Sequence, residues 1–128
     1  MKILVCGGRD FNDWNKLELE LNRIIESRYT NYDEIVIIEG GAKGADSLAR
    51  DYADIYDLGH IKYPAQWGKY GNKAGPIRNQ QMLDEGKPDL VVAFHGKPRE
   101  DGRRTGTQDM VSRAKKAGVK VIEIGYEG

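Results

Sequence analysis

The sequence lacks the features that mark disulfide-rich, membrane-spanning or secreted proteins. It contains one cysteine, Cys6, among 128 residues, which excludes an internal disulfide and any metal site built from several thiolates. No apolar run approaches the roughly 20 residues of a membrane-spanning helix, and the apolar start from Met1 to Gly7 is too short for a signal peptide. We therefore expect a cytoplasmic protein without a membrane partner.

An excess of charge of one sign is also missing. Twenty Lys and Arg residues balance twenty Asp and Glu residues, so the formal net charge is zero. A chain without an overall basic field does not attract nucleic acid broadly, and a site for an anion must be built locally. Nucleic acid is therefore disfavoured as a partner.

What the sequence does contain is a regular alternation of short apolar blocks with longer amphipathic segments. Blocks such as 35–38 and 90–94 have no polar interruption, which is typical of strands covered on both faces. The spacing of apolar residues between the blocks predicts helices. The expected strands are 3–6, 35–39, 60–63, 89–95 and 120–124, and the expected helices are 14–28, 45–56, 76–85 and 107–117. The glycine-rich segment 66–75 and the polar segment 96–105 are expected to be loops.

This alternation predicts an α/β fold. Right-handed crossovers between successive strands give a parallel five-stranded sheet between two layers of helices, for which the strand order 3-2-1-4-5 is the most favoured. The chain has about the length of one ordinary domain. We expect residues 1–128 to form a single Rossmann-like three-layer domain.

Glycine-bearing turns follow three of the predicted strands. The carboxyl ends of parallel strands meet at one edge of a sheet, so these turns are expected to converge where this fold binds ligands. Glycine lets the main chain approach an anion closely, and the N–H groups at the start of the following helix point at negative oxygens. A phosphate would fit there. The residues expected to bind it are Gly7, Gly8, Arg9, Asp10, Gly40, Gly41, Lys43, Gly44, Asp46, Gly106 and Thr107.

Neither common phosphate motif is present. The segment 40–46 lacks the Gly-Lys-Ser/Thr ending of a P-loop, and the segment 7–9 lacks the spacing of the dinucleotide fingerprint. ATP hydrolysis and hydride transfer are therefore disfavoured. No resident cofactor or metal is expected. Asp10 and Glu39 could hold Mg²⁺ that arrives with a phosphate ligand, or a pair of ribose hydroxyls.

Four segments together resemble the YspA-related branch of the SLOG superfamily. They are 7–11, 39–46, 75–82 and 106–109, and they span nearly the whole chain. The superfamily groups Rossmann-like domains that bind nucleotides or nucleotide-derived ligands. It includes the Lonely Guy phosphoribohydrolases, which release a base from a nucleoside monophosphate, and the DNA-processing protein A type, which binds single-stranded DNA. The resemblance implies a sensor or a processing protein for a nucleotide-derived small molecule, and a homo-oligomer, since homodimers are common in the superfamily.

Part of the Lonely Guy motif carries over to this sequence. In those enzymes an Arg in an Arg-Lys-x-x-Met context, and a carboxylate after a Gly-Thr pair, serve the glycosidic bond and the ribose phosphate. Arg78 and Met82 match this context, with Asn79 in place of the Lys, and Gly106-Thr107 matches the phosphate turn. The resemblance therefore adds Arg78 and Asn79 to the expected ligand-binding residues.

The carboxylate pattern departs from those enzymes. Asp109 stands two residues after Thr107, and Met110 occupies the place of their Glu. This departure leaves the expected phosphate binding intact. A phosphoribohydrolase that cleaves the N-glycosidic bond of a nucleoside monophosphate is the enzymatic alternative. In it Asp109 or Glu39 would stabilise an oxocarbenium-like centre, assisted by Arg78.

Aromatic and basic side chains in the predicted loops leave a nucleic-acid alternative open. Trp67 and Tyr70 could stack on the bases of a single strand while the basic segment 96–105 contacts phosphates. One of the two aromatic side chains could instead anchor the core. His95 is the last residue of the predicted strand 89–95 and has no evident partner in the sequence, and His60 is expected to be structural.

Overall fold

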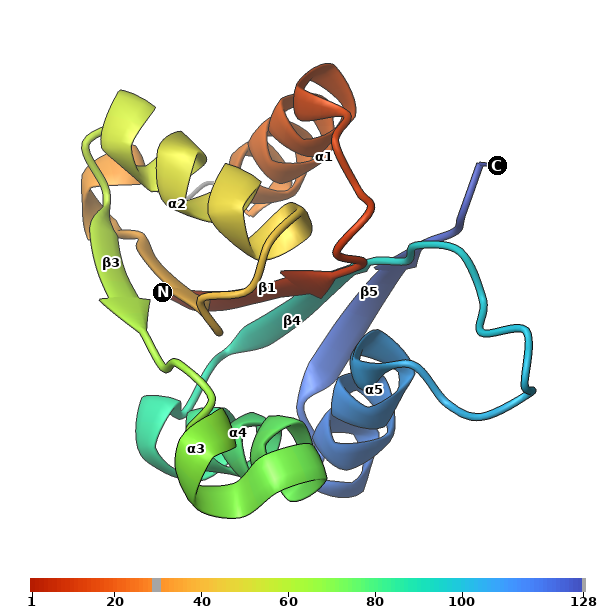
Figure 1. Ribbon diagram of the computed structural model, residues 1–128. Coiled ribbons are helices and arrows are strands. Elements are labelled where there is room, and N and C mark those ends of the chain that lie inside the picture. Colours follow the sequence, from red (N-terminus) through yellow and green to blue (C-terminus); the bar gives the residue numbers. More distant parts are fainter. Residues whose placement is uncertain (29–30, 128) are drawn as a thin grey trace.

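The computed structural model describes residues 1–28 and 31–127, which contain a parallel five-stranded sheet in the order β3-β2-β1-β4-β5 (Figure 1). The strands are β1 (Lys2–Gly7), β2 (Val36–Glu39), β3 (Gly59–Lys62), β4 (Leu90–Phe94) and β5 (Lys120–Ile124). The helices are α1 (Trp14–Ser27), α2 (Ala45–Ile55), α3 (Trp67–Tyr70), α4 (Ala74–Gly86) and α5 (Gly106–Lys116), with 3₁₀ turns at Tyr32–Glu34 and Gly71–Lys73. In the part of the chain described, no helix has the length and apolar content needed to cross a membrane. The predicted α/β class and strand order are confirmed.

Helices cover both faces of the sheet. Figure 1 shows α1 and α2 on one face and α4 and α5 on the other, with α3 beside α4. Successive residues of a strand point to opposite faces. Ile3 and Val5 therefore belong to the core under α1 and α2, whereas Leu4 and Cys6 belong to the core under α4 and α5. Because each central strand is buried on both sides, it has no polar face, which is why the strands read as unbroken apolar runs.

The strands extend from β1 in two directions across the sheet. Strands β2 and β3 lie on one side of β1, and β4 and β5 lie on the other. Strand β1 lies between β2 and β4, with Ile3 opposite both Ile37 and Leu90. Helices α1 and α2 lie in the connections on one side of β1, α3 and α4 lie in the crossover from β3 to β4, and α5 connects β4 to β5 on the other side. The carboxyl ends of β1 and β4 therefore flank the topological switch point, which is where open α/β sheets bind ligands.

The prediction for the segment 66–75 is wrong. The glycine content predicts a loop, but the structure has the single helical turn α3, a 3₁₀ turn and then α4, which begins at Ala74 and not at Pro76. The main-chain N–H of Tyr70 donates to the carbonyl of Gln66, and such local bonds hold one helical turn between glycines. Pro76 fits in the first turn of α4 because an N–H there has no partner inside the helix.

Candidate functional site

The turns after β1 and β2 and the loop that follows β4 are hydrogen-bonded to one another at the carboxyl edge of the sheet. The turn after β1 lies in the middle. The main-chain N–H of Gly8 donates to the carbonyl of Phe94 at 3.0 Å, and the carbonyl of Gly8 accepts from the N–H of Ala45 at 3.2 Å. On the other side, Asp10 Oδ2 accepts from the N–H of Lys97 at 3.1 Å. The turns after β1, β2 and β4 are thus joined by main-chain contacts and form one surface.

Glycine is required at three points of this surface. A Cβ on Gly44 would lie 2.2 Å from the carbonyl oxygen of Gly8, and Gly44 has a φ of +79°, which disfavours any other residue. A Cβ on Gly8 would lie 2.6 Å from Cα of Gly96. A Cβ on Gly7 would lie 2.4 Å from the carbonyl oxygen of Phe94. These glycines let the three turns pack main chain against main chain.

In the turn after β2, side-chain carboxylates accept hydrogen bonds from the main-chain amide groups that were expected to bind a phosphate. Asp46 Oδ2 accepts from the N–H groups of Gly40 and Ala42, each at 3.2 Å. Glu39 Oε1 accepts from the N–H of Gly41 at 2.5 Å. The turn is therefore an anion-binding cradle in which the chain's own carboxylates are the anions.

Asp46, like Glu39, is a buried acidic residue. Its exposed fraction is 5%. Burial raises the pKa of Asp46 to about 6, and the carboxylate of Glu39 raises it as well. The amide groups of Ala42 and Gly40 and the charge of Arg78 act in the opposite direction. The sequence gives the position of Asp46 in the first turn of α2, but nothing in it reveals the desolvation.

Arg78 brings a partly buried positive charge to this cradle. Its Nη1 donates to the carbonyl of Gly40, and its Nε donates to Asn79 Oδ1 at 3.1 Å. Burial lowers the pKa of Arg78, and the positive charge of Arg9 lowers it further, whereas Asp46 raises it. Arg9 itself lies over the ring of Trp67, with 5.5 Å between the guanidinium carbon and the ring centroid. Two guanidinium groups from distant parts of the sequence thus act on each other electrostatically.

Asn79 links Arg78 to the start of α5. Its Nδ2 donates to the carbonyl of Gly106 at 3.2 Å and to Asp109 Oδ2 at 3.0 Å. Asp109 Oδ2 also accepts from Arg113 Nε at 2.8 Å, and Asp109 Oδ1 lies 3.6 Å from Arg104. The candidate residues on α4 and α5 therefore form one hydrogen-bonded network.

The other candidate carboxylate, Glu39, is 1% exposed. Its Oε2 lies 2.7 Å from His60 Nε2, and its Oε1 is held by Gly41. Asp10 lies at the surface, bound to the loop after β4. Among the described residues, no group of three or more His, Cys, Asp and Glu side chains is arranged to hold a metal ion.

The start of α5 has a cap that the sequence analysis missed. Thr105 Oγ1 accepts from the N–H of Gln108 at 3.1 Å, and Gln108 Oε1 accepts from the N–H of Thr105 at 2.9 Å. This capping box has the Thr-x-x-Gln signature, which could have predicted it. Thr107 is buried in the first turn of α5, and a Cβ on Gly106 would meet no atom within 4 Å.

Two expectations about single side chains change. His95, for which the sequence shows no partner, has its Nε2 2.8 Å from Glu123 Oε1. The pairing was hidden because Glu123 lies 28 residues away, on the neighbouring strand β5. Trp67 lies under Arg9 and does not anchor the core, while Tyr70 lies at the surface with the ammonium of Lys69 over its ring.

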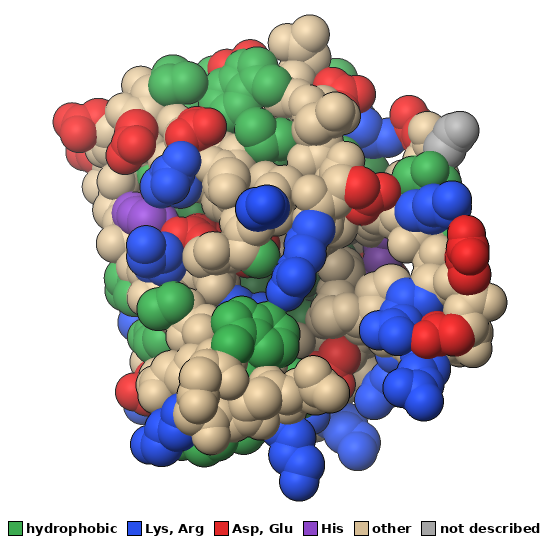
Figure 2. Space-filling model, in the orientation of Figure 1, with side chains coloured by type: hydrophobic (Ala, Val, Ile, Leu, Met, Phe, Trp, Pro, Cys, Tyr) green, Lys and Arg blue, Asp and Glu red, His purple; other side chains and the backbone are tan. Residues whose placement is uncertain are grey.

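Lys and Arg side chains gather on the right of Figure 2, over the loop 95–105 and α5, and acidic side chains lie among them. Several of the basic side chains are paired. Arg99 binds Asp101 through two hydrogen bonds and lowers the pKa of that carboxyl to about 2, and Lys97 lies 3.9 Å from Glu100. Lys43 in the turn after β2 is exposed. This surface has a mixed charge and not a uniformly basic one.

The parallel sheet of this order, with glycine turns joined at its switch point, defines the protein as a Rossmann-like α/β domain. A family model described as the YspA, cpYpsA-related SLOG family matches residues 1–70. The chain is also 33% identical over 133 residues to the Gene 61 protein of Mycobacterium phage D29, in an alignment that covers 97% of this chain and 96% of that protein. The chain belongs to the YspA, cpYpsA-related SLOG family, as its motifs predict.

Proposed function

We propose that this protein binds a nucleotide or a nucleotide-derived ligand at the carboxyl edge of its sheet, as a sensor or a processing protein. The observation that carries the proposal is the position of the partly buried Arg78 beside the joined turns, where its Nη1 donates to the carbonyl of Gly40 and its Nε to Asn79 Oδ1. The positive charge of Arg9 also acts on Arg78, and an anion bound next to both guanidinium groups would stabilise both charges. A phosphate supplies that anion and accepts bidentate hydrogen bonds from guanidinium groups.

The residues that contact the phosphate can be inferred from which main-chain N–H groups already donate to carboxylates of the chain. The amide groups of Gly40, Gly41 and Ala42 bind carboxylates of the chain. The start of α5 is next to Arg78 through Asn79, and its first N–H groups and helix dipole favour an anion. We therefore assign the phosphate to Arg78, Arg9 and the amide groups of Gly106 and Thr107, with Lys43 and the remaining turn residues at the rim.

The geometry favours binding over cleavage of a glycosidic bond. A carboxylate that stabilises an oxocarbenium-like centre must face the sugar. Glu39 is instead held by Gly41 and His60, and Asp109 is held by Asn79 and Arg113. The pairing of Arg99 and Lys97 with acidic neighbours, together with zero net charge, likewise favours a small ligand over a single-stranded nucleic acid.

The test is calorimetric titration of the full chain with AMP, cyclic AMP and ADP-ribose. Arg78→Lys keeps the charge but loses the bidentate geometry, and Arg9→Ala removes an exposed group. Each should weaken binding of the preferred ligand by roughly tenfold or more, because a charge-assisted hydrogen bond contributes about 1.5–3 kcal/mol. Arg50→Ala, an exposed arginine on α2 paired with Asp51, is the matched control and should bind as the parent does.

Two results decide against the proposal. The first is the absence of heat and of thermal stabilisation with every member of the panel. The second is binding that Arg9→Ala and Arg78→Lys leave unchanged. Chromatography of the AMP mixture tests the enzymatic alternative separately, since release of adenine that Asp109→Asn abolishes would establish hydrolysis.

A further inference from the structure

Trp67 is a large aromatic side chain that the proposed phosphate contacts leave unexplained. It begins α3 and is 48% exposed, and neither hydrophobic core of the described residues includes it. The chain's other tryptophan, Trp14, packs against the core under α1 and α2, with its ring centroid 6.3 Å from that of Tyr52. Packing in the core therefore explains Trp14 and gives no reason for the indole of Trp67.

The ring of Trp67 lies beside the residues that we assign to the phosphate. The guanidinium carbon of Arg9 is 5.5 Å from the ring centroid. A Cβ built on Gly75 would lie 3.4 Å from Cη2 of the ring, so the indole lies against the first turn of α4. Gly75 and Arg78 are three residues apart and are therefore neighbours on the helix surface. The indole thus lies next to Arg9 and within one helical turn of Arg78.

The contact with Arg9 indicates what kind of group fits on this ring. A guanidinium is planar and stacks on aromatic faces. A nucleic-acid base is also planar and stacks on the same kind of surface. Arg9 is exposed, so it can leave the ring without disturbing the core. A charge-assisted hydrogen bond to phosphate is stronger than an exposed cation–π contact, and the place of the guanidinium can therefore pass to a base while Arg9 binds the phosphate.

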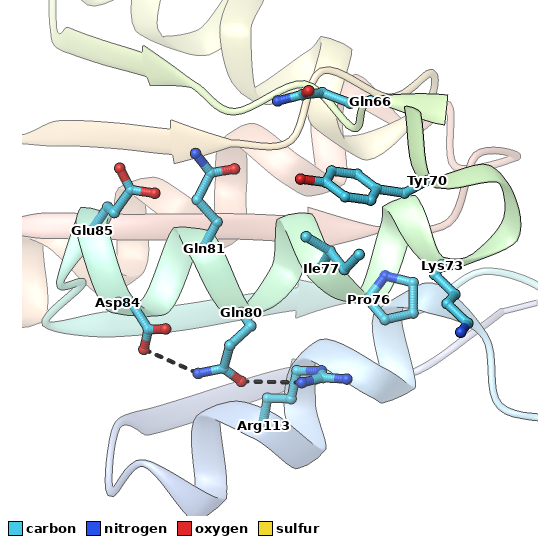
Figure 3. A pocket seen from close by; sticks show the side chains of 10 residues that line it. All are labelled: Gln66, Tyr70, Lys73, Pro76, Ile77, Gln80, Gln81, Asp84, Glu85 and Arg113. Carbon is cyan, nitrogen blue, oxygen red and sulfur yellow. Dashed lines mark hydrogen bonds between the residues drawn. The ribbon is translucent and has the colours of Figure 1, made fainter. Parts of the chain in front are cut away.

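Tyr70, the other aromatic residue of α3, lies in a different place. It is 37% exposed and lines a groove of about 660 Å³ on the outer face of α4, where Figure 3 shows it between Gln66 and Ile77. The ammonium of Lys69 lies 5.1 Å from its ring centroid. None of the residues assigned to the phosphate lines this groove. Tyr70 therefore resembles Trp67 in its helix and its exposure but not in its neighbours.

We propose that Trp67 stacks on the aromatic base of the bound ligand, in the place that Arg9 takes in this structure. The ligand is then a nucleoside phosphate and not a base-free sugar phosphate. The inference rests on the proposed function, because the phosphate on Arg9 and Arg78 brings the base to the ring. Every base has a π face, so stacking tolerates different bases. Trp67 therefore selects for the presence of a base and not for its identity.

Calorimetric titration of the full chain compares AMP, cyclic AMP and ADP-ribose with ribose 5-phosphate, which lacks the base. The parent should bind its preferred nucleotide at least about tenfold more tightly than ribose 5-phosphate, the effect of one stacked base. Trp67→Leu should weaken nucleotide binding by about the same factor and leave binding of ribose 5-phosphate unaltered. Trp67→Phe keeps a ring and should retain most of the affinity for the nucleotide.

Tyr70→Leu is the matched control, since it removes the neighbouring exposed ring, and it should bind every compound as the parent does. Thermal melting verifies that each variant folds. Fluorescence reports on the ring itself, because Trp14→Phe leaves Trp67 as the one tryptophan of the chain. A base stacked on an indole quenches its emission. The nucleotide should therefore quench the emission of this variant over the concentrations at which it binds, and ribose 5-phosphate should quench it much less.

Four outcomes overturn the proposal. They are ribose 5-phosphate that binds as tightly as the nucleotide, Trp67→Leu that binds the nucleotide as the parent does, Trp67→Leu that weakens both compounds by the same factor, and emission that the nucleotide leaves unchanged. Failure of the proposed function has a different signature. If no compound binds, both proposals fall, whereas nucleotide binding that Arg78→Lys weakens and Trp67→Leu leaves unchanged removes the stacking proposal alone.

Discussion

The two turns that lead into α2 and α5 are both rich in glycine, yet they are built in different ways. In the turn before α2, Gly44 touches the main chain of Gly8, and the preceding amide groups bind carboxylates. In the turn before α5, nothing lies within 4 Å of a Cβ built on Gly106, and the helix is closed by its capping box. The first turn needs its glycine for packing, whereas the second has no steric need of one. A glycine without a structural reason is a better pointer to a ligand than one with such a reason.

Gly44→Ala should give the largest loss of stability. The new Cβ would clash with the main chain of Gly8 and Arg9, and the positive φ of Gly44 would add strain. We expect the free energy of unfolding to fall by about 3 kcal/mol or more. Urea denaturation measures it. A stability within about 0.5 kcal/mol of the parent would show that the joined turns are not rigid.

Asp46→Asn should change how stability depends on pH. The pKa of Asp46 is raised by burial from 3.8 to about 6, so the folded state holds its proton more tightly than the unfolded state. The stability that this group contributes is full below about pH 4 and is lost as pH rises through about 6, with a total near 3 kcal/mol.

The variant should lack that loss. Relative to the parent, Asp46→Asn should therefore gain stability between pH 4 and pH 7, as measured by urea denaturation at several pH values. Asp54→Asn, at an exposed position near the end of the same helix, serves as the control. Parallel pH profiles for the parent and Asp46→Asn would contradict the assignment of the pKa.

Thr105→Ala removes the cap of α5. Loss of the hydrogen bond from the Gln108 N–H to Thr105 Oγ1 should cost about 1 kcal/mol. The melting temperature should fall by a few degrees, while Thr105→Ser, which keeps the hydroxyl, should melt close to the parent. Equal melting of the alanine and serine variants would show that the capping box adds nothing.

Gly106→Ala should have the smallest effect on stability and the sharpest contrast with Gly44→Ala. It lies in the first turn of α5 with open space around it, so alanine should stabilise the helix by up to about 1 kcal/mol. The same methyl group would hold a phosphate away from the main chain. A variant that melts higher but binds the preferred nucleotide more weakly is the expected result, and unchanged affinity would remove Gly106 from the site.

Much of this architecture can be predicted from the chain. The unbroken apolar runs ending at Gly7 and Glu39 predict the parallel sheet, and the glycine turns after them predict the edge at which candidate residues gather. The prediction of secondary structure failed in the segment 66–75, where glycine content and local hydrogen bonding favour different structures. The glycines of 66–75 indicate a loop, but local hydrogen bonds form a helical turn.

Hydrogen bonds between residues far apart in the chain could not be predicted, because no spacing in the sequence indicates them. His95 with Glu123, and Asp46 with the amide groups of Gly40 and Ala42, depend on which strands and turns become neighbours.

By itself, the sequence determined the class of fold, the strand order, the family and the edge of the sheet that carries the glycine turns, because periodicity and turn chemistry are local properties. Only the tertiary structure decided which amide groups of that edge are already occupied, which carboxylate is desolvated and which side of α4 stays uncovered. Those properties depend on burial and on contacts between residues far apart in the chain.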